Sequence, residues 1–158
     1  MAKVAQRQVL ADIVPVATAT ASPPKWTNFR FAQVSGGEIT ASVEKIYEGG
    51  KLRPTLLCAP SEIGDITVTA HYDNDPVASD SQTGIEEKLQ KLRPLVGRAL
   101  YDVTIQTYDC DVNSVVPGTG RLYKSALLVG LTEPDGDSSS GAPSTFALTF
   151  AVEDVKKA

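Results

Sequence analysis

Strict alternation of apolar and small polar residues marks three separate segments of the chain. They are "GDITVTAHYDND" (residues 64–75), "GEITASVEKIY" (residues 37–47) and "STFALTFAVEDV" (residues 144–155). Successive side chains of a strand point to opposite sides of the sheet, so each pattern predicts a half-buried strand. The apolar sets, which we expect to face a core, are Ile66, Val68 and Ala70, then Ile39, Ala41 and Val43, then Phe146, Leu148, Phe150 and Val152.

The opposite face of these strands is small, hydroxyl-rich and mostly uncharged. Solvent-facing strands normally carry more lysine, glutamate and arginine, because long charged side chains oppose edge-to-edge aggregation. The pattern therefore indicates a surface past which something slides, or one that lines an enclosed, wet space. Ordinary outer exposure is the alternative, since alternation separates two faces without showing which one looks inward. This face comprises Thr67, Thr69 and His71, then Glu38, Thr40, Ser42 and Glu44, then Thr145, Ala147, Thr149 and Ala151.

One helix is predicted over residues 83–93. Thr83 and Glu86 form a possible capping box at its start, and Pro94 and Gly97 end it. One face of this helix is expected to pack on the sheet while the other stays wet. The apolar positions at helical spacing are Ile85, Leu89, Leu92 and Val96.

Two further strands complete the predicted fold. The segment "RALYDVTIQTYD" (residues 98–109) alternates, whereas "RLYKSALLVGLTEP" (residues 121–134) is more continuously apolar. A continuous apolar run is typical of a strand that is buried on both sides or at an interface. One helix among roughly six to eight strands predicts a mainly β fold, an antiparallel β-sandwich or barrel with one α-helix.

The chain divides into an N-terminal arm over residues 1–25 and a single β-sandwich domain over residues 26–158. Pro23 and Pro24 impose an extended path at the end of the first part, which we expect to hold a short strand near residues 9–14. Within the second part, "YEGGKLRPTLLCAPSEI" (residues 47–63) is too long for a simple hairpin turn. Loops longer than ~12 residues usually serve a function or an interaction.

The composition of the chain adds to these predictions mainly by excluding other classes of protein. The chain has 158 residues, 42% of them hydrophobic, and a net charge of −4. These values favour one globular domain with its own core. It carries no basic stripe of the kind that neutralises phosphates. No segment approaches the ~20 apolar residues of a membrane helix, and Asp12 and Pro15 interrupt the apolar run near the start. We expect Cys58 and Cys110 to be buried thiols rather than a disulfide.

Candidate chemistry is sparse. His71 is the only histidine and has no serine or cysteine nucleophile in a suitable context, so it reads as an ordinary strand position. The acidic segments "DNDPVASD" and "DCD" do not continue into a calcium-binding loop, and "VPGTGR" lacks the ending of a phosphate-binding loop. The sequence therefore predicts no catalytic residue, no metal site and no cofactor, and an enzyme is the weaker class.

Four segments in a fixed order point to a known family. They are "FRFAQVSGGEITASVEKIYEGG", "GDITVTAHYDNDP", "LQKLRPLVGRALYDVTIQ" and "ALLVGLTEPDGDSSSGAPSTFALTFAVEDV". In this order the chain resembles the major tail tube proteins of long, flexible-tailed (siphovirus-type) bacteriophages, especially those that infect actinobacteria. The resemblance spans about residues 29–154 and rests on the succession of elements, because the family has no catalytic motif.

This resemblance implies a structural virion protein made in the host cytoplasm. In that family six β-sandwich subunits form a ring, their inner sheets close into one β-barrel around a channel, and stacked rings form the tube through which the genome travels. The implied partners are other copies of the chain and the tail tip or initiator, tape-measure and tail terminator proteins. DNA passes through the lumen without specific binding, and the chain inserts into no membrane.

The hydroxyl-rich face then becomes the expected channel lining. Basic residues there would hold DNA by releasing its counterions, and threonine, serine and glutamate avoid that. A ring of six chains carries 6 × (−4) = −24 formal charges, so buried interface area must offset self-repulsion. The channel-lining candidates are Glu38, Thr40, Ser42, Glu44, Thr67, Thr69, Thr145 and Thr149.

The loop at residues 47–63 is the expected contact between rings. Its anchors are Arg53, Leu56 and Leu57, because exposed apolar residues need a partner surface. An Ω-like loop packed on its own domain is the alternative. Other readings of the whole chain are a tail terminator, a head-decoration protein, or a β-sandwich adhesin or carbohydrate-binding module. Such a module would normally display aromatic residues, whereas Trp26 is the sole tryptophan.

Overall fold

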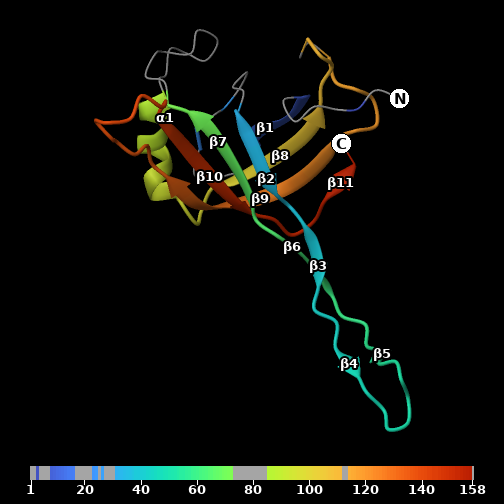
Figure 1. Ribbon diagram of the computed structural model, residues 1–158. Helices are drawn as coiled ribbons and strands as arrows, with labels where there is room; N and C mark the ends of the chain where they lie inside the picture. Colours follow the sequence, from blue (N-terminus) through green and yellow to red (C-terminus); the bar gives the residue numbers. More distant parts are fainter. Residues whose placement is uncertain are drawn as a thin grey trace.

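The computed structural model describes residues 3, 8–16, 23–24, 26, 31–72, 85–111 and 114–157 (Figure 1). The helical elements are α1 (Ile85–Leu92) and the 3-10 turn η2 (Arg93–Leu95). The strands of the body are β1 (Val9–Pro15), β2 (Gln33–Gly36), β7 (Ile66–His71), β8 (Leu100–Thr107), β9 (Arg121–Thr132), β10 (Thr145–Ala151) and β11 (Lys156–Lys157). Four short strands lie outside the body: β3 (Ile39–Ala41), β4 (Lys45–Ile46), β5 (Thr55–Leu56) and β6 (Ser61–Ile63).

The body is one antiparallel sheet that curls on itself. Its strand order is β1-β8-β9-β10-β7-β2, with β11 paired to the first part of β9. The two edge strands, β1 and β2, come close to each other, so the sheet nearly closes around its own inner face (Figure 1). The long strand β9 belongs to both halves, because it pairs with β8 along one edge and with β10 along the other.

Two irregularities in register allow β9 to bend between the halves. The register with β8 shifts between Tyr101 and Val103, where Lys124 and Ser125 form a bulge. Ser125 has a φ of 53°, and its amide donates to Asp102 Oδ1 at 3.1 Å. The register with β10 shifts between Thr149 and Phe150. An extra residue in one strand increases local twist, so these bulges convert a flat sheet into a curled one.

The apolar side of the alternating strands packs inside the curl, as the sequence predicted for β7, β8 and β10. In these strands buried residues alternate with half-buried ones, except that His71 and Thr145 at strand ends are exposed and the last two residues of β8 are both half-buried. Helix α1 closes one end of the core with Ile85, Leu89 and Leu92. The predicted stop is also present, since Gly97 has a φ of 85° just after η2. Thr83, the expected capping residue, lies outside the described residues.

Aromatic packing ties the beginning of the chain into this core. Trp26 is completely buried, with its ring centroid 5.8 Å from those of Phe31 and Phe146, and Lys88 Nζ lies 5.1 Å from the centroid of the indole. Tyr101 OH donates to the carbonyl of Pro24 at 2.9 Å. The expected short strand is present as β1, and its pairing with β8 makes it part of the sheet.

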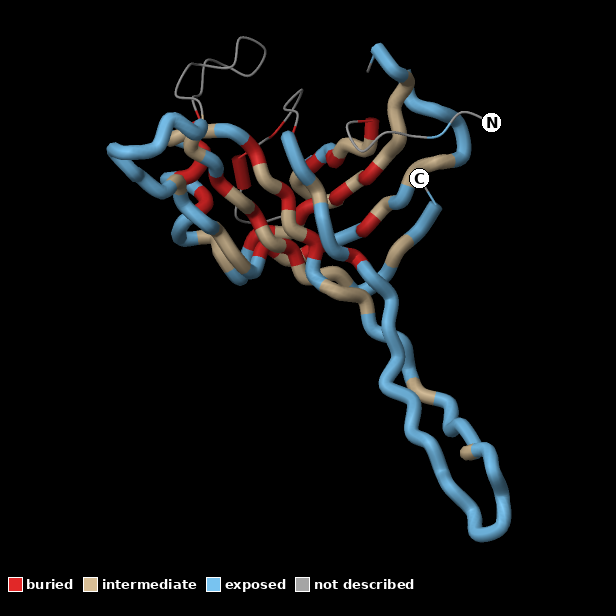
Figure 2. Tube along the Cα trace, viewed as in Figure 1, coloured by how far each residue is buried: buried red, intermediate tan, exposed pale blue. Residues whose placement is uncertain are grey.

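Residues 38–64 form an arm that projects away from the body (Figures 1 and 2). In the arm β3 pairs with β6 and β4 with β5, so it is a long, two-stranded excursion between β2 and β7. The prediction of one strand over residues 37–47 with a core-facing side was therefore wrong. Ile39 and Val43 are 60% and 43% exposed. Alternation made residues 38–44 look like a sheet strand, although no second layer covers them.

Glycines with positive φ set the direction of the arm at its root. Gly36 has a φ of 94°, and a Cβ built there would lie 1.9 Å from the carbonyl oxygen of Asp65. Gly37 has a φ of 77°, and its Cβ would lie 2.8 Å from Tyr123 OH. The Gly64 amide donates to the carbonyl of Glu38 at 2.8 Å and closes the root. Side chains at positions 36 and 37 would thus meet occupied space as well as backbone strain.

The two cysteines also differ from expectation. Neither forms a disulfide, but both are exposed rather than buried, so the prediction of buried thiols was wrong. Cys58 lies in the arm and Cys110 follows the end of β8. Composition does not show which residues lie in the core, and Leu57, the neighbour of Cys58, is itself exposed.

We predict that Trp26→Ala lowers the free energy of unfolding by about 3–5 kcal/mol, because it removes a large, fully buried ring and leaves a cavity. Urea unfolding followed by circular dichroism measures the change. Leu52→Ala is the matched control, since Leu52 is fully exposed and its truncation should change the stability by less than about 0.5 kcal/mol. Equal midpoints for the two variants would contradict the burial of Trp26.

We predict that Gly36→Ala destabilises the protein more than Gly50→Ala. Both glycines have positive φ, at 94° and 82°, but nothing lies within 4 Å of a Cβ at position 50. Gly50→Ala should therefore cost at most the conformational term of about 1–2 kcal/mol, whereas Gly36→Ala adds overlap with the Asp65 backbone. The midpoint of urea unfolding distinguishes them, and a smaller loss for Gly36→Ala would reject the crowded root.

Candidate functional site

A face of small polar residues covers one outer side of the sheet, across β2, β7, β10 and the second half of β9. The strand register arranges it in rows that run across the strands. One row is Ser35, Thr67, Thr149 and Gly130, and the next is Gln33, Thr69, Ala147 and Thr132. The neighbouring register pair, His71 and Thr145, extends these rows. We call these ten residues the threonine face. Apart from His71, none of its side chains is ionisable.

Neighbouring strands are in close contact at the centre of the threonine face. The hydroxyls of Thr67 and Thr149 lie 3.4 Å apart across the strands, either one able to donate. On the other side of Thr149, a Cβ on Gly130 would lie 3.2 Å from the threonine Cβ. Thr67, Thr69 and Thr149 are half-buried on this outer side of the sheet. The centre of the face, at Thr67, Thr149 and Gly130, therefore offers short hydroxyl groups and backbone, whereas Gln33 and His71 are longer side chains of the same face.

The outer side of the other half of the sheet is different. There β1 and β8 present Asp12 opposite Thr104 and Val14 opposite Asp102. Val14 is 55% exposed, and Asp102 accepts from the bulged Ser125. This side combines carboxylates with apolar groups, so the two outer sides of the curled sheet are chemically distinct.

The structure brings together only part of the predicted channel-lining set. Thr67, Thr69, Thr145 and Thr149 lie together on the threonine face. The remaining four, Glu38, Thr40, Ser42 and Glu44, lie on the exposed arm, apart from that face. Alternation in the sequence could not distinguish these two sets of residues. Side chains alternate with a period of two residues both in a strand of a sheet and in a strand of a free arm.

The arm is exposed along most of its length and unusually apolar for such a segment (Figure 2). Among the described residues, seven of the eleven large hydrophobic side chains that are exposed belong to it. Backbone contacts keep it two-stranded: the Leu57 amide donates to the Glu44 carbonyl at 2.9 Å. A Lys51–Glu48 ion pair of 2.7 Å spans the tip. The seven residues are Ile39, Val43, Ile46, Tyr47, Leu52, Leu56 and Leu57.

The predicted inter-ring anchors all lie in this arm. Leu56 is 62% exposed and Leu57 is 40% exposed, and Arg53 lies near the tip, also exposed. The predicted loop over residues 47–63 is thus one side and the tip of the arm, and it contains β5 and β6. An Ω-like loop packed on its own domain does not describe this geometry.

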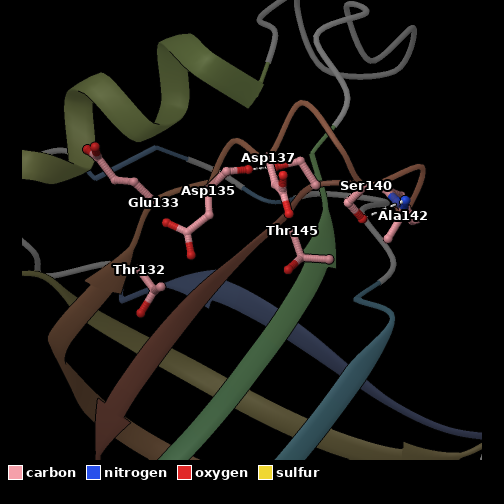
Figure 3. A pocket seen from close by; sticks show the side chains of 9 residues that line it. Thr132, Glu133, Asp135, Asp137, Ser140, Ala142 and Thr145 are labelled. Atoms are coloured by element: carbon pink, nitrogen blue, oxygen red, sulfur yellow. Dashed lines mark hydrogen bonds between the residues drawn. The ribbon is translucent and has the colours of Figure 1, made fainter.

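A hollow lies beside the connection from β9 to β10 (Figure 3). Its polar groups bond largely to one another: the Ser139 hydroxyl donates to Asp137 at 2.7 Å, and the Ser144 hydroxyl donates to the Asp135 carbonyl at 3.1 Å. The serine hydroxyl and amide lower the pKa of Asp137. The hollow is lined by Thr132, Glu133, Asp135, Asp137, Ser140, Ala142, Pro143, Ser144 and Thr145. This arrangement stabilises a turn and offers no evident catalytic group.

A chain of polar contacts fastens helix α1 to this connection. Tyr72 OH donates to Glu86 at 2.8 Å, which raises the pKa of the tyrosine. Arg93 pairs with Glu86 at 3.4 Å and donates to Glu133, whose hydrogen bond raises the pKa of the guanidinium. Sequence reasoning missed this network, because its members are far apart in the chain and share no motif.

The described part of the chain shows neither a group of metal ligands nor a membrane-spanning helix. No three histidine, cysteine, aspartate or glutamate residues among the described ones are grouped to hold a metal ion. His71 lies at the end of β7, exposed, next to Thr145 in the register. Within the described ranges no helix has the length and apolar character needed to cross a membrane.

Solved structures share this architecture at low sequence identity. A chain of the anti-feeding prophage baseplate superimposes with a TM-score of 0.71 at 17% identity, covering 99% of this chain and 95% of that one. A chain of the sheath–tube complex of an extracellular contractile injection system in its extended state gives 0.66 at 13%, covering 98% and 90%. Hcp1 from Flavobacterium johnsoniae gives 0.53 at 12%, covering 94% and 93%.

No protein-family model matches the sequence, and no curated protein matches it significantly. At these identities the structural matches show the fold alone. Each covers nearly the whole of both chains, arm included. The predicted fold class is therefore confirmed: the chain has a mainly β, antiparallel tail-tube-like fold with one helix.

Proposed function

We propose that this chain is the subunit of a tail tube, in which hexameric rings stack into a hollow polymer. The observation that carries the proposal is the arm, which displays seven of the eleven exposed large apolar side chains among the described residues. A tail-tube-like fold supports the same role. The role is structural and uses no catalytic residue.

The arm is proposed as the contact between rings. An isolated two-stranded hairpin is marginally stable in water, and exposed apolar surface of this extent marks an interaction site. Burying a leucine side chain contributes about 1.5–3 kcal/mol. Arg53, Leu56 and Leu57 are the proposed anchors. Because a ring has six arms, the modest binding free energy of one arm counts six times between two rings.

The threonine face is proposed to line the channel through Thr67, Thr69, Thr145 and Thr149. It presents no lysine or arginine, so a polyanion would pass without the counterion release that makes DNA binding tight. The curled sheet also leaves β1 and β2 as exposed edges, and ring closure would pair them. Glu38, Thr40, Ser42 and Glu44 belong instead to the arm contact.

We place the tube in the tail of a siphovirus-type phage, where DNA is delivered into the host and the partners are the tail tip or initiator, tape-measure and terminator proteins. A contractile injection system is the second candidate, favoured by the likeness to a chain from a sheath–tube complex. A sheath would then be an additional partner. A tail terminator, a head-decoration protein and a binding module are weaker alternatives, because none of them requires a polymerising arm.

Negative-stain electron microscopy of concentrated protein tests the proposal. We expect rings with a central hole or hollow tubes, either with the protein alone or after addition of tail-tip components. Single rings that never stack would favour a terminator. Dispersed monomers under both conditions would reject the tube.

Deleting residues 48–60 is predicted to leave a folded protein that does not stack, because the deletion removes the arm tip without reaching the core. Circular dichroism checks the fold, and pelleting with electron microscopy checks assembly. The milder variant Leu56→Ser with Leu57→Ser should act in the same direction. Tubes of normal length from the deletion variant would reject the arm as the ring contact.

A cysteine at position 69 is predicted to be protected in tubes. In a Cys58→Ser, Cys110→Ser background, Thr69→Cys should react with a large polymer-linked maleimide in free subunits and much more slowly in tubes. Gln90→Cys, on the exposed side of α1, is the control and should react in both. Equal labelling of position 69 before and after assembly would place the threonine face outside the channel.

A further inference from the structure

A second exposed apolar patch lies on the opposite side of the body from the arm. Residues 108–111 and 114–120 connect β8 to β9, and we call them the β8–β9 turn. In Figure 1 this turn lies at the top of the molecule, whereas the arm extends from its foot. Val115 and Val116 are each 38% exposed there.

Internal hydrogen bonds hold the β8–β9 turn so that the valine side chains stay outside. The Val116 amide donates to the Thr107 carbonyl at 2.9 Å, and the Asp109 amide donates to the Ser114 carbonyl at 2.9 Å. The Ser114 hydroxyl donates to Asp109 Oδ2 at 2.9 Å, and Thr119 donates to the Val116 carbonyl at 2.7 Å. These hydrogen bonds fix the shape of the turn, while Val115 and Val116 remain partly exposed.

The outer part of the arm and the β8–β9 turn carry opposite charges, whereas the whole arm, residues 38–64, has a net charge of −1 because it also contains Glu38, Glu44 and Glu62. Residues 45–58 of the arm contain Lys45, Lys51 and Arg53 against Glu48, a net charge of +2. The β8–β9 turn contains Asp109 and Asp111 and no basic residue, a net charge of −2. The next basic residue, Arg121, points its Nη1 toward Tyr123 OH at 3.4 Å. Complementary charge of this kind fixes register and suppresses wrong partners.

We propose that the arm of one subunit docks on the β8–β9 turn of a subunit in the adjacent ring. Leu56 and Leu57 cover Val115 and Val116, and Arg53 lies against Asp111, which is exposed. The inference rests on the proposed tube and names the acceptor surface for its arm. Patches that are complementary but lie on opposite sides of one molecule make a heterologous, head-to-tail contact, which continues as an open polymer rather than closing as a dimer.

A charge exchange tests the contact directly. Arg53→Asp and Asp111→Arg should each raise the protein concentration needed for pelletable tubes about tenfold, which is the loss of about 1.4 kcal/mol per contact. The double variant should recover most of the wild-type assembly, because the pair is restored with reversed sign. Val115→Ser with Val116→Ser tests the apolar part and should weaken assembly in the same way.

Glu87→Arg is the matched control, since it reverses a charge on the exposed side of α1 and should assemble as the wild type does. Circular dichroism confirms that every variant is folded. If the single variants lose assembly and the double variant does not recover it, the Arg53–Asp111 pairing is overturned. If all turn variants form normal tubes while the arm deletion forms none, the arm docks elsewhere, and the tube itself stands. A wild type that never assembles overturns both.

Discussion

The bend of β9 is the constraint on which the rest of the molecule depends. This strand pairs with β8 and β11 in its first part and with β10 in its second, so a single segment belongs to both halves of the sheet. Its two register shifts place the halves around a shared core that contains Tyr101 and Tyr123 on one side and Phe146 and Phe150 on the other. A straight β9 would leave the inner face of each half open to water.

The same bend separates the surfaces that matter for function. Because the apolar sides of β7, β8 and β10 point into the curl, the outer side is free to differ between the halves. One half shows hydroxyls and backbone, and the other shows Asp12, Asp102 and Val14. The β8–β9 turn and the β9–β10 connection extend from the two ends of β9, so the bend also sets where these loops lie.

The body and the arm differ in how they bury large apolar residues. In the body, most large apolar residues are buried, with Val14, Val115, Val116 and Val129 as the exposed exceptions, and α1 and Trp26 cover what the sheet leaves open. In the arm, they are exposed, although glycines at its root hold it in a defined direction. Such a segment gains little from its own chain, because two strands cannot bury each other's side chains. Its apolar character has a physical reason only if another surface covers it.

The sequence by itself determined the period-2 strands of the body, the single helix and the mainly β class, because alternation and helical spacing are local properties of the chain. Positions 66–71, 100–107 and 145–151 alternate as predicted, and Ile85, Leu89 and Leu92 face the core. In any fold that buries one face of each strand and helix, the side chains of these residues would point into the core.

Only the tertiary structure decided which alternating segments form the sheet. Residues 38–44 have the same pattern as β7 but lie on the arm, since pairing partners far along the chain, and not the period, place a strand in a layer. The Arg93 network and the exposure of Cys58 and Cys110 escaped prediction for the same reason. The threonine face likewise depends on register between β2, β7, β10 and β9, and register is a long-range property that no local pattern contains.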